Sequence, residues 1–246
     1  MQNLEEKVVA ITGANVGIGK AIAVKLSEKG TKVVLGARNT ELLEKVVEEI
    51  RSKGGEAAFV KIDVSHKADL ARLVNAAVTV YGKLDVMVNN AGVAGISRVD
   101  ELDVHSWDEM IDINIKGTLY GMAAAIPVFK QQQSGHIVNI ISTSGIKIVP
   151  TQAVYAATKN AVRTISEAFR QESDGSIRIT GISPGYVKTD FAVKSVNTKD
   201  LKAAASNAVK SLAISPEAVA NAVIYAISQP KDVEVGDIVI RPAKQH

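Results

Sequence analysis

The chain has 246 residues, of which 46% are hydrophobic, 22% charged and 4% aromatic. This length suits one large α/β domain with a continuous core, so we expect a single domain over residues 1–246. The formal net charge is only +3 and basic residues are scattered among acidic ones, so neither a nucleic acid nor a membrane surface is an expected partner. No apolar stretch approaches the roughly 18 residues of a transmembrane helix, and the first residues lack the apolar core of a signal peptide. A cytoplasmic protein is therefore expected.

The residue types also limit the chemistry. The chain contains no cysteine, which excludes disulfides, a thiolate nucleophile and cysteine-based zinc or iron–sulfur sites. Its four histidines never occur at the spacing of metal ligands, so we expect no metal.

Short apolar runs alternate with helix-like stretches along the whole chain. The expected strands are Val8–Thr12, Lys32–Gly36, Ala57–Ile62, Leu84–Val88, His136–Ile141, Ile177–Ile182 and Asp237–Ile240. Most of them lack polar alternation, as strands do when both faces of a parallel sheet are covered. The clearest helices are Ile18–Lys29, Leu42–Lys53, a third that follows Ser65 and ends near Tyr81, and a last one that opens at Ser215-Pro216. We therefore expect a Rossmann-type, doubly wound α/β fold of about seven parallel strands with helices on both faces.

Two segments stand apart from this pattern. Met110–Phe129 is apolar almost all round, so it is expected to pack on a partner subunit as well as on its own sheet. Lys188–Ile214 is polar, rich in Ala, Lys and Ser, and poor in aromatic residues. A mobile lid and a solvated connector explain it equally well.

The first expected strand runs into a glycine-rich turn, Thr12-Gly13-Ala14-Asn15-Val16-Gly17-Ile18-Gly19, which is followed by a helix. Glycines at such a turn let the backbone approach a pyrophosphate, whose charge is held by the helix N-terminus. A P-loop is excluded because Ala14 stands at its leading glycine and Ala21 at its magnesium-binding Ser or Thr.

The spacing of this turn, T-G-x-x-x-G-x-G, resembles that of the short-chain dehydrogenase/reductase family. The resemblance covers the whole chain: further matches are Asn89-Asn90-Ala91-Gly92, Tyr155-Ala156-Ala157-Thr158-Lys159, Ser142 thirteen residues before that tyrosine, Asn114, and Pro184-Gly185-Tyr186-Val187-Lys188-Thr189. The Tyr-x-x-x-Lys motif is weak by itself, but six motifs in the family's order and spacing are specific.

The resemblance implies reversible hydride transfer between a nicotinamide and a carbonyl or secondary alcohol. Carbonyl reduction builds negative charge on oxygen, and a tyrosine, with a free pKa near 10, suits this proton transfer at neutral pH only if a cation favours its phenolate. Lys159 lies one helical turn from Tyr155, on the same face. The family's pattern makes Tyr155 the acid/base, Lys159 its activator and a ribose ligand, Ser142 the partner of the substrate oxygen, and Asn114 the anchor of a proton-relay water.

The resemblance also implies a set of cofactor-binding residues: Gly13, Asn15, Gly17, Ile18, Gly19, Arg38, Asp63, Val64, Asn90, Gly92, Tyr155, Lys159, Pro184, Gly185, Val187 and Thr189. NAD-preferring members carry an acid after the second strand, where this chain has Ala37, and Arg38 follows it. A guanidinium suits a 2′-phosphate, so NADP(H) is the expected cofactor. Val16 is a departure, since many NADP-preferring members carry a basic residue there.

The sequence leaves the substrate open within the class of carbonyl and alcohol compounds. The ending, residues 237–245, is similar to members that act on serine or 3-hydroxy acids, and to others with broad carbonyl substrates. Arg98, Lys188 and Lys194 are the candidate partners of a substrate carboxylate, although solvent exposure explains each of them more simply. A catalytically silent, NADP-sensing protein is the alternative, but such a protein has no need of the Tyr–Lys pair. The resemblance further implies a homotetramer, built on Met110–Phe129 and on the helix that carries Tyr155.

Overall fold

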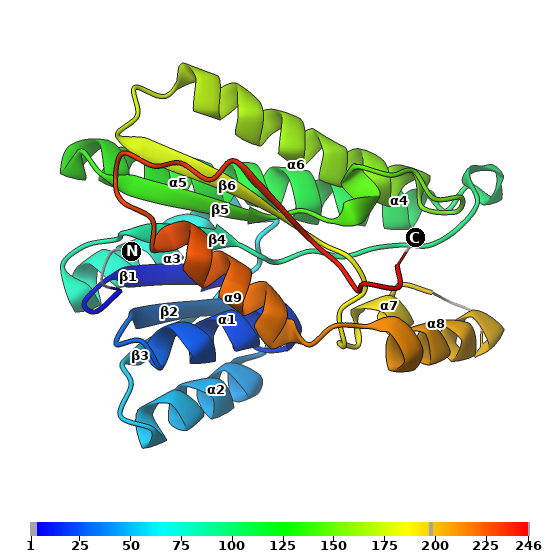
Figure 1. Cartoon of the computed structure of the whole chain (residues 1–246), viewed down its shortest axis with the longest axis horizontal. Coiled ribbons are helices and arrows are strands. Elements are labelled where there is room, and N and C mark those ends of the chain that lie inside the picture. Colours follow the sequence, from blue (N-terminus) through cyan, green and yellow to red (C-terminus); the bar gives the residue numbers. More distant parts are fainter. Residues whose placement is uncertain (1–3, 197–198, 246) are drawn as a thin grey trace.

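The computed structural model describes residues 4–196 and 199–245. Its centre is one parallel sheet in the order β3-β2-β1-β4-β5-β6-β7 (Figure 1). The strands are β1 Val8–Thr12, β2 Lys32–Ala37, β3 Ala57–Lys61, β4 Val86–Asn89, β5 Gly135–Ile140, β6 Ile177–Pro184 and β7 Asp237–Ile240. The expected doubly wound sheet of seven parallel strands is confirmed, with strand ends displaced by one or two residues.

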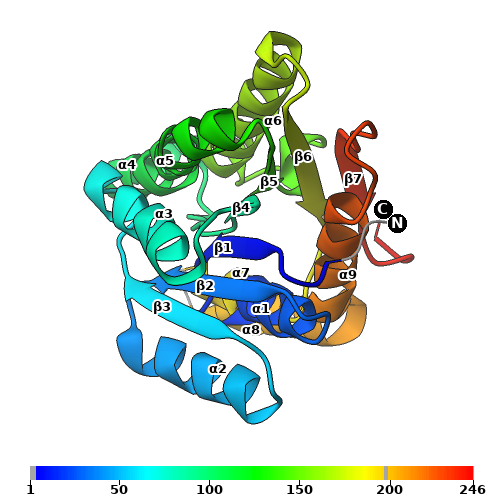
Figure 2. The ribbon, with the colours of Figure 1, turned by 90° about the vertical axis from the view of Figure 1, so that its left-hand side faces the viewer.

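Helices cover both faces of the sheet, as Figure 2 shows end-on. They are α1 Gly17–Ser27, α2 Thr40–Ser52, α3 Lys67–Tyr81, α4 Val104–Met110, α5 Gly117–Gln132, α6 Ala153–Glu172, α7 Phe191–Lys194, α8 Lys199–Leu212 and α9 Pro216–Ile227. Alternate strand residues point to opposite faces: Val9 and Ile11 pack with α1, α2 and α9, whereas Val8 and Ala10 pack with α3 and α5. Burial on both sides explains the continuous apolar runs in the sequence.

The segment Met110–Phe129, expected to be one helix, belongs to three successive helical elements. The α-helix α4 ends at Met110, a π-helix η2 spans Ile111–Lys116, and α5 begins at Gly117. A π-turn holds one more residue than an α-turn, so it changes the direction in which the following side chains point. This insertion lies at Asn114, one of the expected site residues.

The described residues between Lys188 and Ile214 are largely helical, with α7 and α8 beyond the carboxyl ends of the strands (Figure 1). Its described ends are fixed: the Lys188 amide donates to the Ile214 carbonyl at 2.8 Å, and the Ile214 amide donates to the Tyr186 carbonyl at 3.0 Å. It is therefore more structured than a solvated connector. No helix within residues 4–196 and 199–245 is long and apolar enough to cross a bilayer.

The strand order reverses at β1, whose neighbours are β2 on one side and β4 on the other. The crossover helices that leave these strands go to opposite faces, which opens a crevice at the carboxyl ends of β1 and β4. The fold therefore predicts a ligand site there.

Candidate active site

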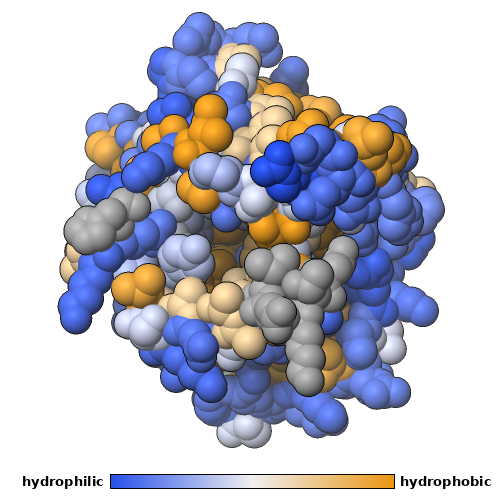
Figure 3. Space-filling view, turned by 90° about the vertical axis from the view of Figure 1, so that its right-hand side faces the viewer, coloured by the Kyte–Doolittle hydropathy of each residue, from blue (hydrophilic) through white to orange (hydrophobic). Residues whose placement is uncertain are grey.

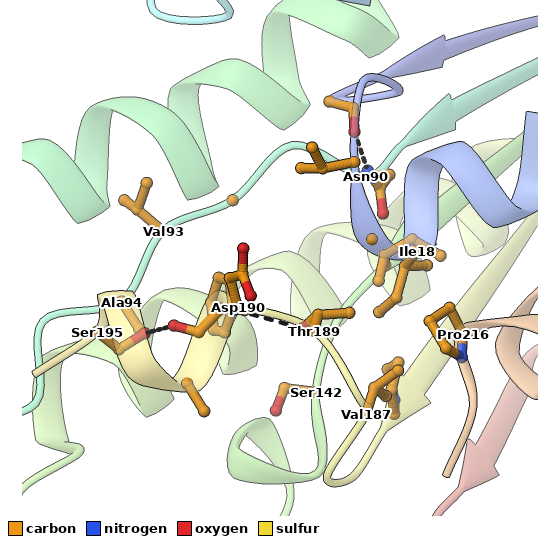
Figure 4. A pocket seen from close by; sticks show the side chains of 18 of the residues that line it. Ile18, Asn90, Val93, Ala94, Ser142, Val187, Thr189, Asp190, Ser195 and Pro216 are labelled. Atoms are coloured by element: carbon orange, nitrogen blue, oxygen red, sulfur yellow. Dashed lines mark hydrogen bonds between the residues drawn. The ribbon is translucent and has the colours of Figure 1, made fainter. Parts of the chain in front are cut away.

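A cleft of about 1870 Å³ occupies this edge of the sheet. Figure 4 shows Ile18, Asn90, Ser142, Val187 and Thr189 gathered around it from separate segments of the chain. Every expected cofactor-binding residue except Gly19 lines the cleft, and so do three of the four expected catalytic residues, Ser142, Tyr155 and Lys159. Gly19 and Asn114 lie behind its wall.

The turn between β1 and α1 forms one end of the cleft. Gly17 adopts φ +56°, a conformation that L side chains rarely adopt, and a Cβ there would lie 3.1 Å from the Thr189 methyl group. At Gly19 a Cβ would overlap the Gly13 carbonyl and the Asn90 side chain, so this glycine permits close packing rather than ligand contact. Val16, the N-cap of α1, provides no side-chain acceptor for the first amides of the helix. Free amides at a helix N-terminus fit a pyrophosphate.

Hydrogen bonds join this turn to the loop after β4. The Asn90 and Ala91 amides both donate to the Thr12 hydroxyl at 3.0 Å. The Asn90 side chain donates to the Thr12 and Gly13 carbonyls at 2.8 and 3.2 Å. These bonds keep the two loops in contact across the crevice, so the cleft has a rigid floor.

Tyr155 and Lys159 lie on α6, one turn apart, and both are buried. The Lys159 ammonium lies 5.9 Å from the centre of the Tyr155 ring and donates to the Ile140 carbonyl at 3.0 Å. Burial raises the pKa of Tyr155 to about 12, and the neighbouring Ser142 hydroxyl opposes that rise. Burial lowers the pKa of Lys159 to about 8. The structure thus brings a phenol and an ammonium together in a poorly hydrated place.

Ser142 follows β5 and is the N-cap of a short 3₁₀ turn, η3 Thr143–Gly145. Its hydroxyl accepts a hydrogen bond from the Ser144 amide at 3.1 Å, which fixes the side chain at the wall of the cleft. The hydroxyl keeps its own proton to donate to a ligand oxygen.

Asn114 is fully buried, and both the oxygen and the nitrogen of its side-chain amide form hydrogen bonds with protein groups. Its Oδ1 accepts from the Val93 amide at 2.9 Å, and its Nδ2 donates to the Val93 carbonyl at 2.9 Å and to the Thr158 hydroxyl at 3.0 Å. Thr158 in turn donates to the Tyr155 carbonyl at 2.8 Å. Asn114 therefore connects η2, the loop after β4 and the helix that carries Tyr155.

Arg38 and Asp63 line the opposite end of the cleft, after β2 and near the end of β3. Arg38 is exposed, whereas Ala37 beside it is buried. Burial raises the pKa of Asp63, but hydrogen bonds from the Ser65 hydroxyl and amide, together with the Arg38 charge, outweigh it and lower that pKa. The Asp63 carboxylate accepts from Ser65 at 2.7 and 3.0 Å, so it also shapes its own turn.

The candidate partners of a substrate carboxylate lie in different places. Arg98 makes two hydrogen bonds to Asp100, at 2.8 and 2.7 Å, and does not line the cleft. Lys188 and Lys194 line the cleft, and Lys194 pairs with Asp190 at 3.7 Å. The expectation for Arg98 finds no support in this geometry. No cluster of three or more metal-binding side chains occurs in the part of the chain that the structure describes.

Two contacts of the site involve residues that belong to no recognisable sequence motif. The Phe191 ring lies 6.0 Å from the Tyr155 ring, tilted by 49°. Gln245, near the C-terminus, accepts from the Tyr186 amide at 2.9 Å and donates to the Thr143 hydroxyl at 3.3 Å. Each contact joins residues far apart in the sequence, and neither residue type is distinctive, so the sequence holds no signal for them.

A doubly wound sheet with a glycine turn at its switch point defines a dinucleotide-binding protein. A family model described as short chain dehydrogenase matches residues 7–200, and the chain belongs to this family of oxidoreductases. It is 43% identical to the uncharacterized oxidoreductase Lmo0432 of Listeria monocytogenes, over 98% of both chains. Two similar solved structures are a serine dehydrogenase in complex with NADP+ (TM-score 0.89, 31% identity, 97% of this chain and 96% of that one) and levodione reductase (0.89, 26%, 96% of each).

Proposed function

We propose that the protein catalyses reversible, NADP(H)-dependent interconversion of a carbonyl compound and a secondary or primary alcohol. The observation that carries the proposal is the buried Tyr155–Lys159 pair, which faces the same cleft as the glycine turn. A protein that only senses a nicotinamide has no use for a buried phenol paired with an ammonium, so this pair favours catalysis over sensing.

The cofactor, when bound, supplies the hydride in reduction and accepts it in oxidation. The amides at the start of α1 would hold its pyrophosphate, and Lys159 its nicotinamide ribose. Pro184, Gly185, Val187 and Thr189 would line the nicotinamide end. A relative of known structure is described in complex with NADP+, which supports a nicotinamide cofactor.

The chain's own residues would manage the proton. In reduction, the Tyr155 hydroxyl donates its proton to the substrate oxygen while the Ser142 hydroxyl donates a hydrogen bond to the same oxygen. The Lys159 ammonium stabilises the phenolate that results. Asn114 holds Val93 and Thr158 and so positions α6 against the loop after β4, which suits a supporting role in the relay of protons toward Lys159.

NADP(H) is preferred in this proposal because of Ala37 and Arg38. No carboxylate stands at position 37 to accept hydrogen bonds from a free 2′-hydroxyl, and the exposed guanidinium beside it suits a 2′-phosphate. We also propose a homotetramer, whose contacts include α5 and α6. A serine or 3-hydroxy acid dehydrogenase is the alternative, suggested by the serine dehydrogenase relative.

The test is NADPH oxidation with a panel of aldehydes, ketones, diketones and keto esters, and NADP+ reduction with serine and 3-hydroxy acids. Tyr155→Phe keeps the ring and removes only the phenolic oxygen. It should lower kcat by about 10²–10⁴-fold on any substrate that the native enzyme turns over, while NADPH binding, followed by fluorescence, stays nearly unchanged. More than a tenth of the native kcat in this variant would refute the role of Tyr155.

A further inference from the structure

We propose that the substrate is a neutral carbonyl compound with an apolar, ring-sized body, and not a hydroxy acid or keto acid. This inference rests on the proposed function and deepens it. It concerns the part of the cleft next to Tyr155.

Four large apolar side chains line the cleft and remain partly exposed, and one of them, Phe191, contacts Tyr155. They are Ile146 and Val149 after η3, Tyr186 after β6, and Phe191 at the start of α7, with exposed fractions of 49, 39, 38 and 38%. Figure 3 shows apolar side chains around the hollow of this face of the molecule. Apolar groups that converge in a concave site mark the place where a ligand's apolar surface binds.

The apolar wall reaches the proposed proton donor itself. The Phe191 ring packs on the Tyr155 ring with 6.0 Å between centroids, and its remaining surface faces the cleft. A substrate whose oxygen meets the Tyr155 hydroxyl therefore places the group beside its carbonyl carbon against or close to Phe191. An aromatic or alicyclic ring gains from that contact, since stacked or tilted rings attract one another beyond the area they bury.

A substrate carboxylate next to the reacting carbon needs a cation fixed beside Tyr155 and Ser142. Among the described residues, each basic side chain at this end of the cleft either binds another protein group or is exposed to solvent. Lys159 donates to the Ile140 carbonyl, and Lys194 pairs with Asp190 on a side chain that is 72% exposed. The other basic side chains of this end, Lys147, Lys188 and Arg241, are exposed, and the acids Asp190 and Glu109 line the same cleft. Exposed lysines recognise a carboxylate weakly, and nearby acids repel it.

The experiment compares ethyl benzoylformate, a neutral aryl keto ester, and benzoylformamide, its neutral and smaller amide, with benzoylformate, the corresponding anion, so that the effect of charge is separated from that of the ethyl group. With NADPH and the full-length protein, we expect kcat/KM to be at least tenfold higher for the ester and for the amide than for the anion. Equal values for the amide and the anion, or a preference for the anion, would overturn the inference while leaving the proposed function intact. Failure to turn over any carbonyl or alcohol with NADPH, NADH or their oxidised forms, in a protein that binds them, would overturn both.

Phe191 variants test the wall directly. Phe191→Ala should lower kcat/KM for ethyl benzoylformate by about tenfold or more, and for propanal, whose ethyl group offers far less apolar surface to the wall than a ring, by less than about threefold. Phe191→Leu keeps apolar volume and should retain most of the activity on the ester. Tyr225→Ala, an exposed aromatic on α9 outside the cleft, is the matched control and should change neither value. An equal loss for both substrates in Phe191→Ala would mean that the ring only supports Tyr155, and would contradict the assignment of a substrate wall.

Discussion

Lys159 keeps its charge in a place that disfavours it. Burial lowers the pKa of its ammonium to about 8 in the folded chain, against about 10.5 in the unfolded chain. Between these values the unfolded state binds more protons, so the free energy of unfolding rises with pH through this window. Below pH 8 the buried charge reduces stability in full. Such a cost is common where a side chain serves chemistry rather than folding.

The stability of Lys159→Met should reveal this cost. The variant removes the titrating group, so the difference in unfolding free energy, native minus variant, should increase by up to about 2–3 kcal/mol from pH 7.5 to pH 10. Denaturant unfolding of the cofactor-free proteins at five pH values measures it. Burial also lowers the pKa of Lys7. Because Lys7 is present in both proteins, its contribution to the pH dependence cancels in the difference. A difference that stays flat or declines with pH contradicts the placement of a charged Lys159 in a dry site.

The same variant should change the pH dependence of catalysis. In oxidation the phenolate is the proton acceptor, so the rate rises as the Tyr155–Lys159 pair loses its first proton, which the lowered pKa of Lys159 places at about 8. With Met at position 159 the phenol ionises alone, and burial raises its pKa to about 12. Without the cation the phenolate is less favoured, and the rising limb of kcat/KM for alcohol oxidation should move upward by a unit or more. An unchanged limb together with weaker cofactor binding would leave Lys159 a binding residue only.

Cofactor preference should depend on Ala37 and Arg38. A charge-assisted hydrogen bond to a 2′-phosphate contributes about 1.5–3 kcal/mol, so kcat/KM should favour NADP(H) over NAD(H) by at least about tenfold. Ala37→Asp combined with Arg38→Ala should invert the preference, because a carboxylate binds the free 2′-hydroxyl and repels the phosphate. Kinetics with both cofactors on both proteins decide the matter. A native preference for NAD(H), or a preference unchanged in the double variant, contradicts the role of Arg38.

At the scale of elements, the sequence predicts what depends on local pattern. Five of the seven strands, β1, β2, β4, β5 and β6, could be located because they are buried on both faces, and the glycine turn because its spacing is unusual. The π-helix η2 could not be predicted, since its extra residue is held by contacts of Asn114 with Val93 and Thr158, 21 and 44 residues away. The sequence likewise placed Tyr155 and Lys159 on one helical face but had no signal for Phe191, which reaches Tyr155 only through the path of α7.

Gln245, in the C-terminal segment, makes another contact between residues far apart in the sequence. Gln245 joins the loop after β6, through the Tyr186 amide, to the loop after β5, through the Thr143 hydroxyl next to Ser142. Gln245→Leu loses both hydrogen bonds, and we expect kcat/KM to decline about three- to tenfold. Gln245→Glu should retain most of the activity, because a carboxylate accepts from the Tyr186 amide and from the Thr143 hydroxyl.

The control for that experiment is Lys244→Ala, which alters an exposed neighbour in the same segment. Melting temperatures should be measured alongside the kinetics. If Gln245→Leu lowers the melting temperature and leaves kcat/KM unchanged, the glutamine only anchors the chain end, and its role in positioning the two loops is wrong.

On the scale of the whole molecule, the strand order decides which distant residues meet. The carboxyl ends of β1, β4, β5 and β6 lie side by side, so Gly13, Asn90, Ser142 and Gly185 line one cleft although they span most of the chain. Right-handed crossovers between parallel strands make this order predictable from the βα rhythm and the first glycine turn. The width of the cleft and the apolar character of its inner end are not predictable in this way, because they depend on how α7 and α8 close over the sheet.

The outer side of α5 offers a surface for assembly with further copies of the chain. The outer side of α5 carries Leu119, Ala123 and Pro127 at four-residue steps, all exposed, and Leu119 keeps 40% of its surface. An apolar stripe on a helix whose other side already packs on the sheet is expected to pack against a second copy of the chain. Leu119→Asp places a charge in that contact and should dissociate the proposed tetramer, so that the mass measured by light scattering corresponds to two chains or one. Val80→Asp, on the exposed side of α3 and more exposed at 55%, is the matched control and should keep the native mass. A native protein that is monomeric, or a Leu119→Asp protein that remains tetrameric at micromolar concentration, would show that this stripe is not the contact.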